Sequence, residues 1–189
     1  MRAGLSLDRV VLAAAELADE AGFNALTVST LARRLGIRTP SLYTYVDGNA
    51  DLRIRLAALA LDESADRLVA AIGRRPADAA LRILADTWRD YARAHPGRYA
   101  ATRQPVPDSG TPASRSAIAA GRRHADLLRS LTSGLGVPDE QANHAVRLIG
   151  SIIHGYVSLE LAGAFAHSQP PSDDSWHYAI DRLTDLLAR

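Results

Sequence analysis

The apolar residues among the first fifty positions recur at steps of three and four, which is the spacing of one helix face. Three such runs follow one another, over residues 7–21, 28–35 and 40–46. Gly22 and Gly36 follow the first two runs and are suited to ending them, because glycine readily adopts the left-handed conformation. The third run is short for a structural helix, and the layout of the three predicts a helix-turn-helix DNA-binding unit.

Two threonines are placed to cap helices in this segment. Thr27 precedes the second helix, and Thr39 precedes Pro40, whose fixed φ suits the first helical position. In the third helix, Leu42 and Val46 share a face that can pack on the first two helices. The third helix is therefore expected to begin at Pro40, with Thr39 as its cap.

The outward face of the third helix is expected to carry hydroxyl groups. Ser41, Thr44 and Tyr45 should point outward, with Tyr43 at the edge. Short hydrogen-bonding side chains and phenols suit the base edges of a major groove. In an alternative interpretation, the two tyrosines are partly buried and fasten a small three-helix unit.

Positive charge gathers in this segment although the chain as a whole is nearly neutral. The formal net charge is +1, yet the residues from Ala21 to Val46 include Arg33, Arg34 and Arg38 and no acid. This pattern predicts a basic patch there. The arginines of the second helix could equally be solvated without touching a phosphate.

The residues from Leu7 to Leu52 resemble the N-terminal domain of the TetR family of bacterial repressors. The resemblance lies in two runs, Leu31-Ala32-Arg33-Arg34-Leu35-Gly36 and Thr39-Pro40-Ser41-Leu42-Tyr43. It implies that Thr27 holds a phosphate, that Ser29 lies near the groove and that Tyr43 contacts a phosphate. It also implies positions at base edges or along the sugar-phosphate wall for Thr39, Pro40, Ser41, Thr44 and Tyr45. We include Arg38 in the same candidate surface.

The chain departs from the family pattern at two positions. Val46 stands where many members have an aromatic ring, which is a tolerable core substitution. Asn49 stands where many have a lysine, so the dependence of DNA affinity on salt should be weaker by roughly one phosphate. Asn49 remains a DNA-surface candidate and could still cap a helix.

The remainder of the chain is large enough for a second region and has a helical composition. Aromatic residues make up only 5% of the 189 residues, and no alternating apolar runs suggest strands. Helices are expected at residues 49–73, 78–95, 113–133 and 138–166, and after a proline-rich cluster at 170–174. We therefore expect an all-α protein with a DNA-binding domain at residues 1–48 and a regulatory and dimerisation domain at 49–189.

Between these helices, a short turn is expected around Arg98 and Tyr99, and three prolines predict a flexible loop at residues 104–112. The chain has no cysteine, so thiolate metal sites are excluded, and no metal or cofactor is expected. No apolar run reaches about 18 residues, and no leader-like segment precedes the first helix. A cytoplasmic location without a membrane partner is the expectation.

The 138–166 helix is apolar on more than one side, so two partners must cover it. We expect one side to pack within its own chain and the other to form a four-helix homodimer interface with the last helix. A fully buried central helix in a monomer is the alternative. The predicted dimer residues are Ile149, Ile152, Tyr156, Trp176, Ile180, Leu183 and Leu187.

Residues 94–100 and 153–160 resemble a TetR subgroup with a His-Gly-bearing regulatory domain. That resemblance implies an unknown small-molecule effector within the helical bundle, whose binding releases a palindromic DNA operator. Ordinary core packing is the alternative role for these side chains. The candidate effector walls are Ile83, Thr87, Trp88, Tyr91, Ala120, His124, Leu127 and His154.

Two other classes of protein compete with a DNA-binding repressor. A small all-helical enzyme is disfavoured, because no helical zinc motif, phosphate loop or nucleophile elbow occurs. Trp88, His124 and His154 could still converge on Glu160 or another carboxylate. No catalytic residue is therefore assigned. A protein-interaction module with a vestigial DNA-binding unit is the other alternative, which the missing lysine at Asn49 keeps open.

Overall fold

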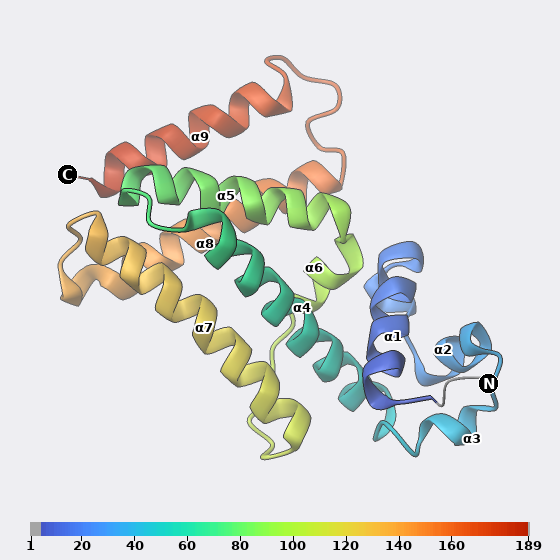
Figure 1. Ribbon diagram of the computed structural model, residues 1–189. Coiled ribbons are helices and arrows are strands. Elements are labelled where there is room, and N and C mark those ends of the chain that lie inside the picture. Colours follow the sequence, from blue (N-terminus) through green and yellow to red (C-terminus); the bar gives the residue numbers. More distant parts are fainter. Residues whose placement is uncertain (1–4, 189) are drawn as a thin grey trace. The chain divides into compact units, whose positions relative to one another are not determined.

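The computed structural model describes residues 5–188, which form helices and no strand (Figure 1). The all-α prediction is confirmed. No helix in this described range is long and apolar enough to cross a membrane. The elements are α1 (Leu7–Ala21), the 3-10 turn η1 (Phe23–Ala25), α2 (Val28–Leu35), α3 (Thr39–Leu42), α4 (Gly48–Ile72), α5 (Ala77–Ala94), α6 (Pro96–Thr102), α7 (Pro112–Gly134), α8 (Asp139–Leu161) and α9 (Ser172–Leu187).

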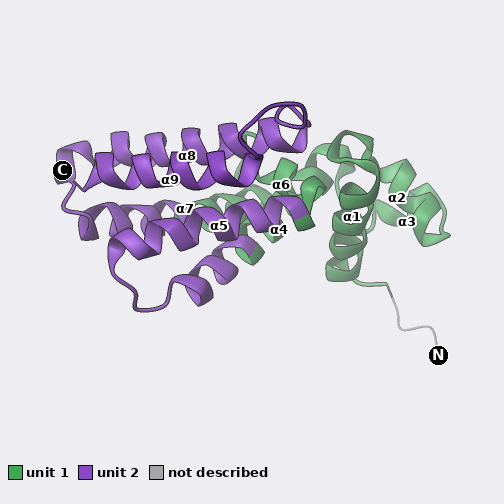
Figure 2. Cartoon of the chain, turned by 90° about the horizontal axis from the view of Figure 1, so that it is seen from above, with its two compact units in different colours: residues 1–63, 94–122 green, residues 64–93, 123–189 purple. Residues whose placement is uncertain are grey.

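The chain divides into two compact units, which Figure 2 shows in different colours. Unit 1 comprises residues 1–63 and 94–122, and unit 2 comprises residues 64–93 and 123–189. Two long helices, α4 and α7, begin in unit 1 and end in unit 2. These units are defined by contacts within the chain. The predicted boundary after residue 48 separates DNA binding from regulation and dimerisation, and it stays a prediction.

The first helices of unit 1 form where the apolar spacing predicts them. Ser6 caps the N-terminus of α1, where its hydroxyl accepts the Arg9 N–H, and Gly22 follows the last turn with a φ of 88°. The inner faces of α1, α2 and α3 meet the first turns of α4 in one core, whose fully buried side chains include Leu31, Leu42 and Leu52. Burial of these side chains supplies most of the stability of such a small unit.

Helix α6 was expected to be a turn, and this prediction is wrong. Pro96 begins the helix, and Gly97 lies directly on the backbone of α1, where an added Cβ would overlap the Ala18 carbonyl group. Asp19 of α1 accepts the backbone N–H of Arg98 at 2.9 Å and contacts its guanidinium at 3.0 Å. Contacts with α1 therefore stabilise a helix that is too short to form on its own.

The core of unit 2 combines buried side chains of α5, α8 and α9 with those of the C-terminal parts of α4 and α7. Trp176 is completely buried, and its indole N–H donates to the Asp86 carboxylate at 2.7 Å. Helix α8 ends at Leu161, five residues earlier than predicted. The reason is Gly163, which has a φ of 76° and precedes an Ala164 N–H that donates back to the Leu159 carbonyl at 3.0 Å.

Candidate DNA-binding surface

The N-terminus of α2 is closed by a capping box. Thr27 accepts the Thr30 N–H at 3.0 Å, and the Thr30 hydroxyl oxygen accepts the Thr27 N–H at 2.9 Å. The predicted cap is thereby confirmed. Ser29 is exposed next to it, and its N–H has no acceptor among the described residues.

Asn49 also caps α2 and not its own helix. Its side-chain oxygen accepts the Val28 N–H at 2.7 Å, across 21 positions of sequence. The expectation that Asn49 can cap is therefore met at α2. At the start of α4 the Asp51 carboxylate accepts the Asp47 N–H at 3.0 Å.

The third helix is shorter than predicted and begins one residue earlier. Thr39 is its first residue and not its cap, and Arg38 precedes the helix without a side-chain cap bond. After Leu42 the chain continues as a tight turn in which the Tyr45 N–H donates to the Leu42 carbonyl at 2.9 Å. A three-residue hydrogen bond of this kind winds the backbone more tightly than an α-helix does.

Four of the predicted surface residues in and after α3 are exposed together. Pro40, Ser41, Tyr43 and Thr44 face solvent, with Tyr43 exposed over 58% of its surface, while Thr39 is half-buried. They offer two aliphatic hydroxyls and one phenol within five consecutive positions. Such a surface is suited to hydrogen bonds with base edges and phosphates.

Tyr45 does not point outward as predicted. It is half-buried against the core of unit 1, and its hydroxyl donates to the Leu5 carbonyl at 2.9 Å. Tyr45 follows Leu42 by three residues and so shares its inner side, whereas Tyr43 is turned away from it. The alternative interpretation, an aromatic ring that fastens the three-helix unit, therefore holds for Tyr45 and not for Tyr43.

The three arginines of this segment have different surroundings. Arg34 forms ion pairs with Glu16 at 3.3 Å and Glu20 at 2.5 Å on α1. The hydrogen bond from Arg34 lowers the pKa of Glu20. Arg33 and Arg38 are exposed and make no ion pair with any described residue. The available positive charge is therefore that of Arg33 and Arg38.

The candidate effector residues are divided between the units. Ala120 belongs to unit 1, and the other seven belong to unit 2. Trp88 brings three of them together, because its ring lies 5.7 Å from that of His124, stacked, and 4.8 Å from that of His154. Its indole N–H donates to the buried Ser64 hydroxyl at 3.2 Å.

The remaining candidates in unit 2 do not share one set of contacts. Tyr91 is buried with the Arg67 guanidinium 5.0 Å from its ring centre. Ile83, Thr87 and Leu127 are half-buried. Their effector role stays a prediction.

Most of the predicted dimer residues are already buried within a single chain. Ile149, Trp176, Ile180 and Leu183 are at most 3% exposed, while Ile152, Tyr156 and Leu187 are half-buried. The four buried side chains pack inside unit 2 and cannot also face a second copy. The large apolar side chains that do face solvent on α8 and α9 are Leu159, Leu161, Tyr178 and Leu186.

A charged cluster in unit 2 was not foreseen. Arg89 is 5% exposed and binds Glu160 through two hydrogen bonds, of 2.8 and 2.5 Å, and Asp173 through a third of 2.6 Å. Ser172 and Arg93 also donate to Glu160. The hydrogen bonds from Arg89 are the largest cause that lowers the pKa of Glu160 to about 2, followed by those from Ser172 and Arg93. Burial alone would raise this pKa.

This cluster bears on the suggestion that the aromatic set converges on Glu160. The described partners of that carboxylate are two arginines and a serine. Glu160 therefore serves an ion-pair cluster and is held as a carboxylate, which does not suit a catalytic acid beside Trp88. The sequence contains all these charges, but a separation of 71 positions between Arg89 and Glu160 hides the pairing.

Sequence comparison matches the chain to two family models. Residues 10–54 match the family described as bacterial regulatory proteins, tetR family, and residues 81–183 match the tetracyclin repressor-like C-terminal domain. The HTH-type transcriptional regulator Rv0681 of Mycobacterium tuberculosis is 35% identical over 162 residues, which are 85% of this chain and 72% of the relative. The HTH-type regulator YobS of Bacillus subtilis is 31% identical over 168 residues, which are 89% of this chain and 85% of the relative.

Solved structures show the same fold. A protein of unknown function from Rhodococcus sp. RHA1 has a TM-score of 0.78 at 22% identity, covering 100% of this chain and 98% of its own. A variant of TetR from Acinetobacter baumannii AYE, solved in complex with minocycline, has a TM-score of 0.70 at 22% identity over 96% of both chains. From the two family models and the two relatives together, the chain belongs to the TetR family and is a DNA-binding transcriptional regulator.

Proposed function

We propose that the protein is a repressor that binds a palindromic operator as a homodimer and is released by a small-molecule effector. The observation that carries the DNA-binding part is the exposed row of hydroxyl side chains at Ser41, Tyr43 and Thr44. Arg33 and Arg38 of the same three-helix segment are exposed and have no ion-pair partner among the described residues. An operator-binding surface needs groups that hydrogen-bond to base edges and cations that contact phosphates. The hydroxyl groups can supply the first and the arginines the second.

In this proposal the phosphate contact of Thr27 uses the N-terminus of α2. The Thr27 hydroxyl is engaged in the capping box, whereas the Ser29 N–H has no acceptor within residues 5–188. A phosphate oxygen at that N–H would also meet the positive end of the helix dipole. Tyr45 and Asn49 act by holding the surface in place, since both make intramolecular hydrogen bonds.

The experiment for this part selects bound duplexes from a random DNA pool and measures affinity for the winners at several salt concentrations. An inverted repeat should emerge, with a steep loss of affinity as salt rises. Arg38→Ala should reduce the slope of log affinity against log salt concentration by about one. Arg103→Ala removes the same charge at an exposed position of unit 1 and should leave the slope unchanged. Absence of any enriched sequence would favour the vestigial DNA-binding unit instead.

The homodimer part of the proposal rests on the exposed apolar side chains of α8 and α9. Leu159, Tyr178 and Leu186 are each more than half exposed in the single chain. Exposed large apolar groups on adjacent helices favour a protein partner. A second copy would place two operator surfaces in successive major grooves, roughly 34–36 Å apart.

The effector part rests on Trp88 with His124 and His154 in unit 2. Aromatic and imidazole groups around one indole are suited to a small polar aromatic or amphipathic molecule. Because α4 begins beside α2 and continues into unit 2, it is the proposed connection between effector and operator. A panel of small molecules should contain one that releases labelled operator from the wild type but not from Trp88→Ala or His154→Ala.

A further inference from the structure

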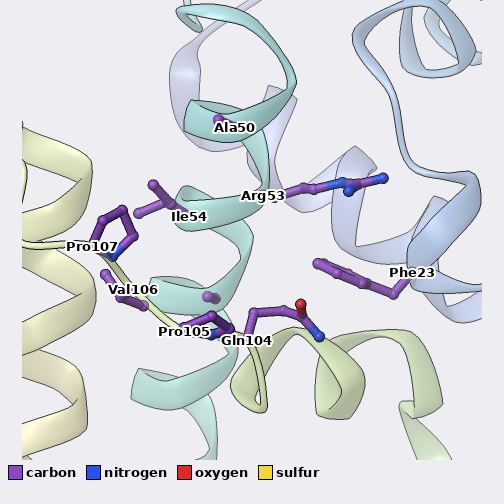
Figure 3. Close-up of a pocket in the computed structure, with 9 residues that line it drawn as sticks. Phe23, Ala50, Arg53, Ile54, Gln104, Pro105, Val106 and Pro107 are labelled. Carbon is purple, nitrogen blue, oxygen red and sulfur yellow. The ribbon is translucent and has the colours of Figure 1, made fainter.

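Unit 1 contains a pocket that lies outside the predicted effector walls. It has a volume of about 260 Å³ and opens between α4, η1 and the loop that follows α6 (Figure 3). Helix α4 contributes Ala50, Arg53, Ile54 and Ala57, and the loop contributes residues 104–107. All its lining residues belong to unit 1, whereas seven of the eight predicted effector residues belong to unit 2.

Arg53 brings an unneutralised positive charge to this pocket. Its Nε and Nη2 donate to the Leu26 carbonyl at 3.3 and 3.2 Å, and Nη2 also donates to the Asn24 carbonyl at 3.2 Å. Its guanidinium carbon lies 5.3 Å from the centre of the Phe23 ring. No carboxylate pairs with Arg53 among residues 5–188, and its Nη1 has no acceptor there. A half-buried guanidinium in this state favours an anion as a partner.

The pocket has one polar end and one apolar end. In Figure 3 the polar groups of Arg53 and Gln104 lie toward the Phe23 ring, while Ile54, Val106 and Pro107 lie at the opposite end. The Gln104 amide donates one N–H to the Ala100 carbonyl at 3.3 Å, which leaves its second N–H for another oxygen. A ligand that fits must combine a small anionic head with a short apolar tail.

We propose that this pocket binds a small monocarboxylate, with its carboxylate at Arg53 and Gln104 and its hydrocarbon tail against Ile54, Val106 and Pro107. The pocket volume lies just below that of drug-sized sites, so the tail is a chain of a few carbons or a single ring. Phosphate or sulfate would leave the apolar end empty. This site is distinct from the effector site of the proposed function, and neither depends on the other.

Occupation of the pocket would act directly on the segment that leads into α2. The carbonyls that Arg53 holds belong to Asn24 and Leu26, immediately before Thr27. A carboxylate bound through Nη1 leaves those bonds intact and ties the 104–107 loop to the same arginine. The ligand therefore stabilises the DNA-binding unit as folded, and unfolding should occur at a higher temperature in its presence.

Hexanoate is the first probe, with 1-hexanol as the uncharged control and inorganic phosphate as the tailless one. Titration of the full chain, followed by amide chemical shifts, should show saturable binding with a dissociation constant on the order of 1 mM. The shifts should map to α4 and residues 104–107. Hexanol and phosphate should each bind at least about tenfold more weakly, a difference of roughly 1.4 kcal/mol.

Two variants test the assignment in different ways. Arg53→Gln should weaken hexanoate binding at least about tenfold, while Arg74→Gln, an exposed arginine of unit 2, should not change it. Ala50→Leu fills space in the pocket without touching the Arg53 bonds, so it decides the question if the Arg53 variant does not fold. Equal binding of hexanol, unchanged binding in both pocket variants, or no saturation below about 10 mM would overturn the proposal.

Discussion

The side chain of Asn49, in the first turn of α4, accepts the backbone N–H of Val28, the first residue of α2, at 2.7 Å. The position at which many family members have a lysine thus serves here to hold two helices together. Asparagine is uncharged, so Asn49 caps α2 but cannot contact a phosphate as a cation. Lysine at this position would supply the cation and lose the cap.

Asn49→Lys should steepen the salt dependence of operator affinity by about one unit of slope, because it adds one cation near the phosphates. The same change should lower the free energy of unfolding by about 1 kcal/mol, since the Val28 N–H loses its acceptor. Salt-dependent anisotropy and thermal unfolding measure the two effects. Asn24→Ala, at an exposed asparagine with no side-chain bond among the described residues, should leave both unchanged.

The two tyrosines after Leu42 should respond differently to loss of their hydroxyls. Tyr45→Phe should reduce stability by about 1 kcal/mol, because the Leu5 carbonyl loses its donor. Tyr43→Phe should leave stability unchanged and weaken operator binding, since this hydroxyl faces solvent. Denaturant unfolding and DNA titration of both variants test this pair. Equal effects of the two changes on stability would contradict the orientation given for these rings.

The cluster around Glu160 should make the protein sensitive to acid. Its pKa is lowered to about 2 from an ordinary value of 4.5, so the unfolded chain binds the proton first as the pH falls. The stabilisation is complete above about pH 4.5 and is lost between there and pH 2. It amounts to about 3 kcal/mol when the shift is converted directly.

Glu160→Gln removes this contribution and leaves Arg89 buried without its main partner. We expect it to lower the free energy of unfolding by about 3 kcal/mol at about pH 7. The difference from the wild type should shrink as the pH falls from 4.5 to 2. Asp185→Asn, which breaks only an exposed pair with Arg182, should lower stability by less than about 1 kcal/mol. A difference that stays constant down to about pH 2 would refute the assignment.

The proposed dimer should depend on exposed side chains and not on the buried ones first expected. A double change, Tyr178→Asp with Leu186→Asp, should give a monomer at concentrations where the wild type is a dimer, because apolar contacts would receive two charges. Sedimentation measures the mass, and circular dichroism checks that the helices remain. Leu12→Asp, at an exposed leucine of α1, should remain dimeric.

The sequence predicted those helices whose limits are set locally. Gly22 and Gly36 end α1 and α2 as expected, because glycine reaches positive φ without a steric cost. Helix α6 could not be predicted in this way. Its seven residues follow His95 and begin with Pro96-Gly97, which reads as a turn, and its stability comes from Asp19 and Ala18 on another helix.

The candidate sites show the same limit. Spacing identified the α2 and α3 residues, but the short turn after Leu42 carries Tyr45 to the inner side, where an outward position was expected, and leaves Tyr43 exposed. The apolar character of α8 and α9 was recognised, yet periodicity does not say which partner covers a face. Trp176 and Ile180 are covered by their own chain.

The contact between Gly97 and Ala18 has a consequence for how the fold tolerates change. Most helix pairs meet through side chains, so the distance between the helices can be adjusted by substitutions that add or remove a methyl group. Between α1 and α6 two backbones touch with no side chain in the gap at residue 97. The spacing of these helices therefore cannot be tuned by small steps: it is kept with glycine or lost with every other amino acid.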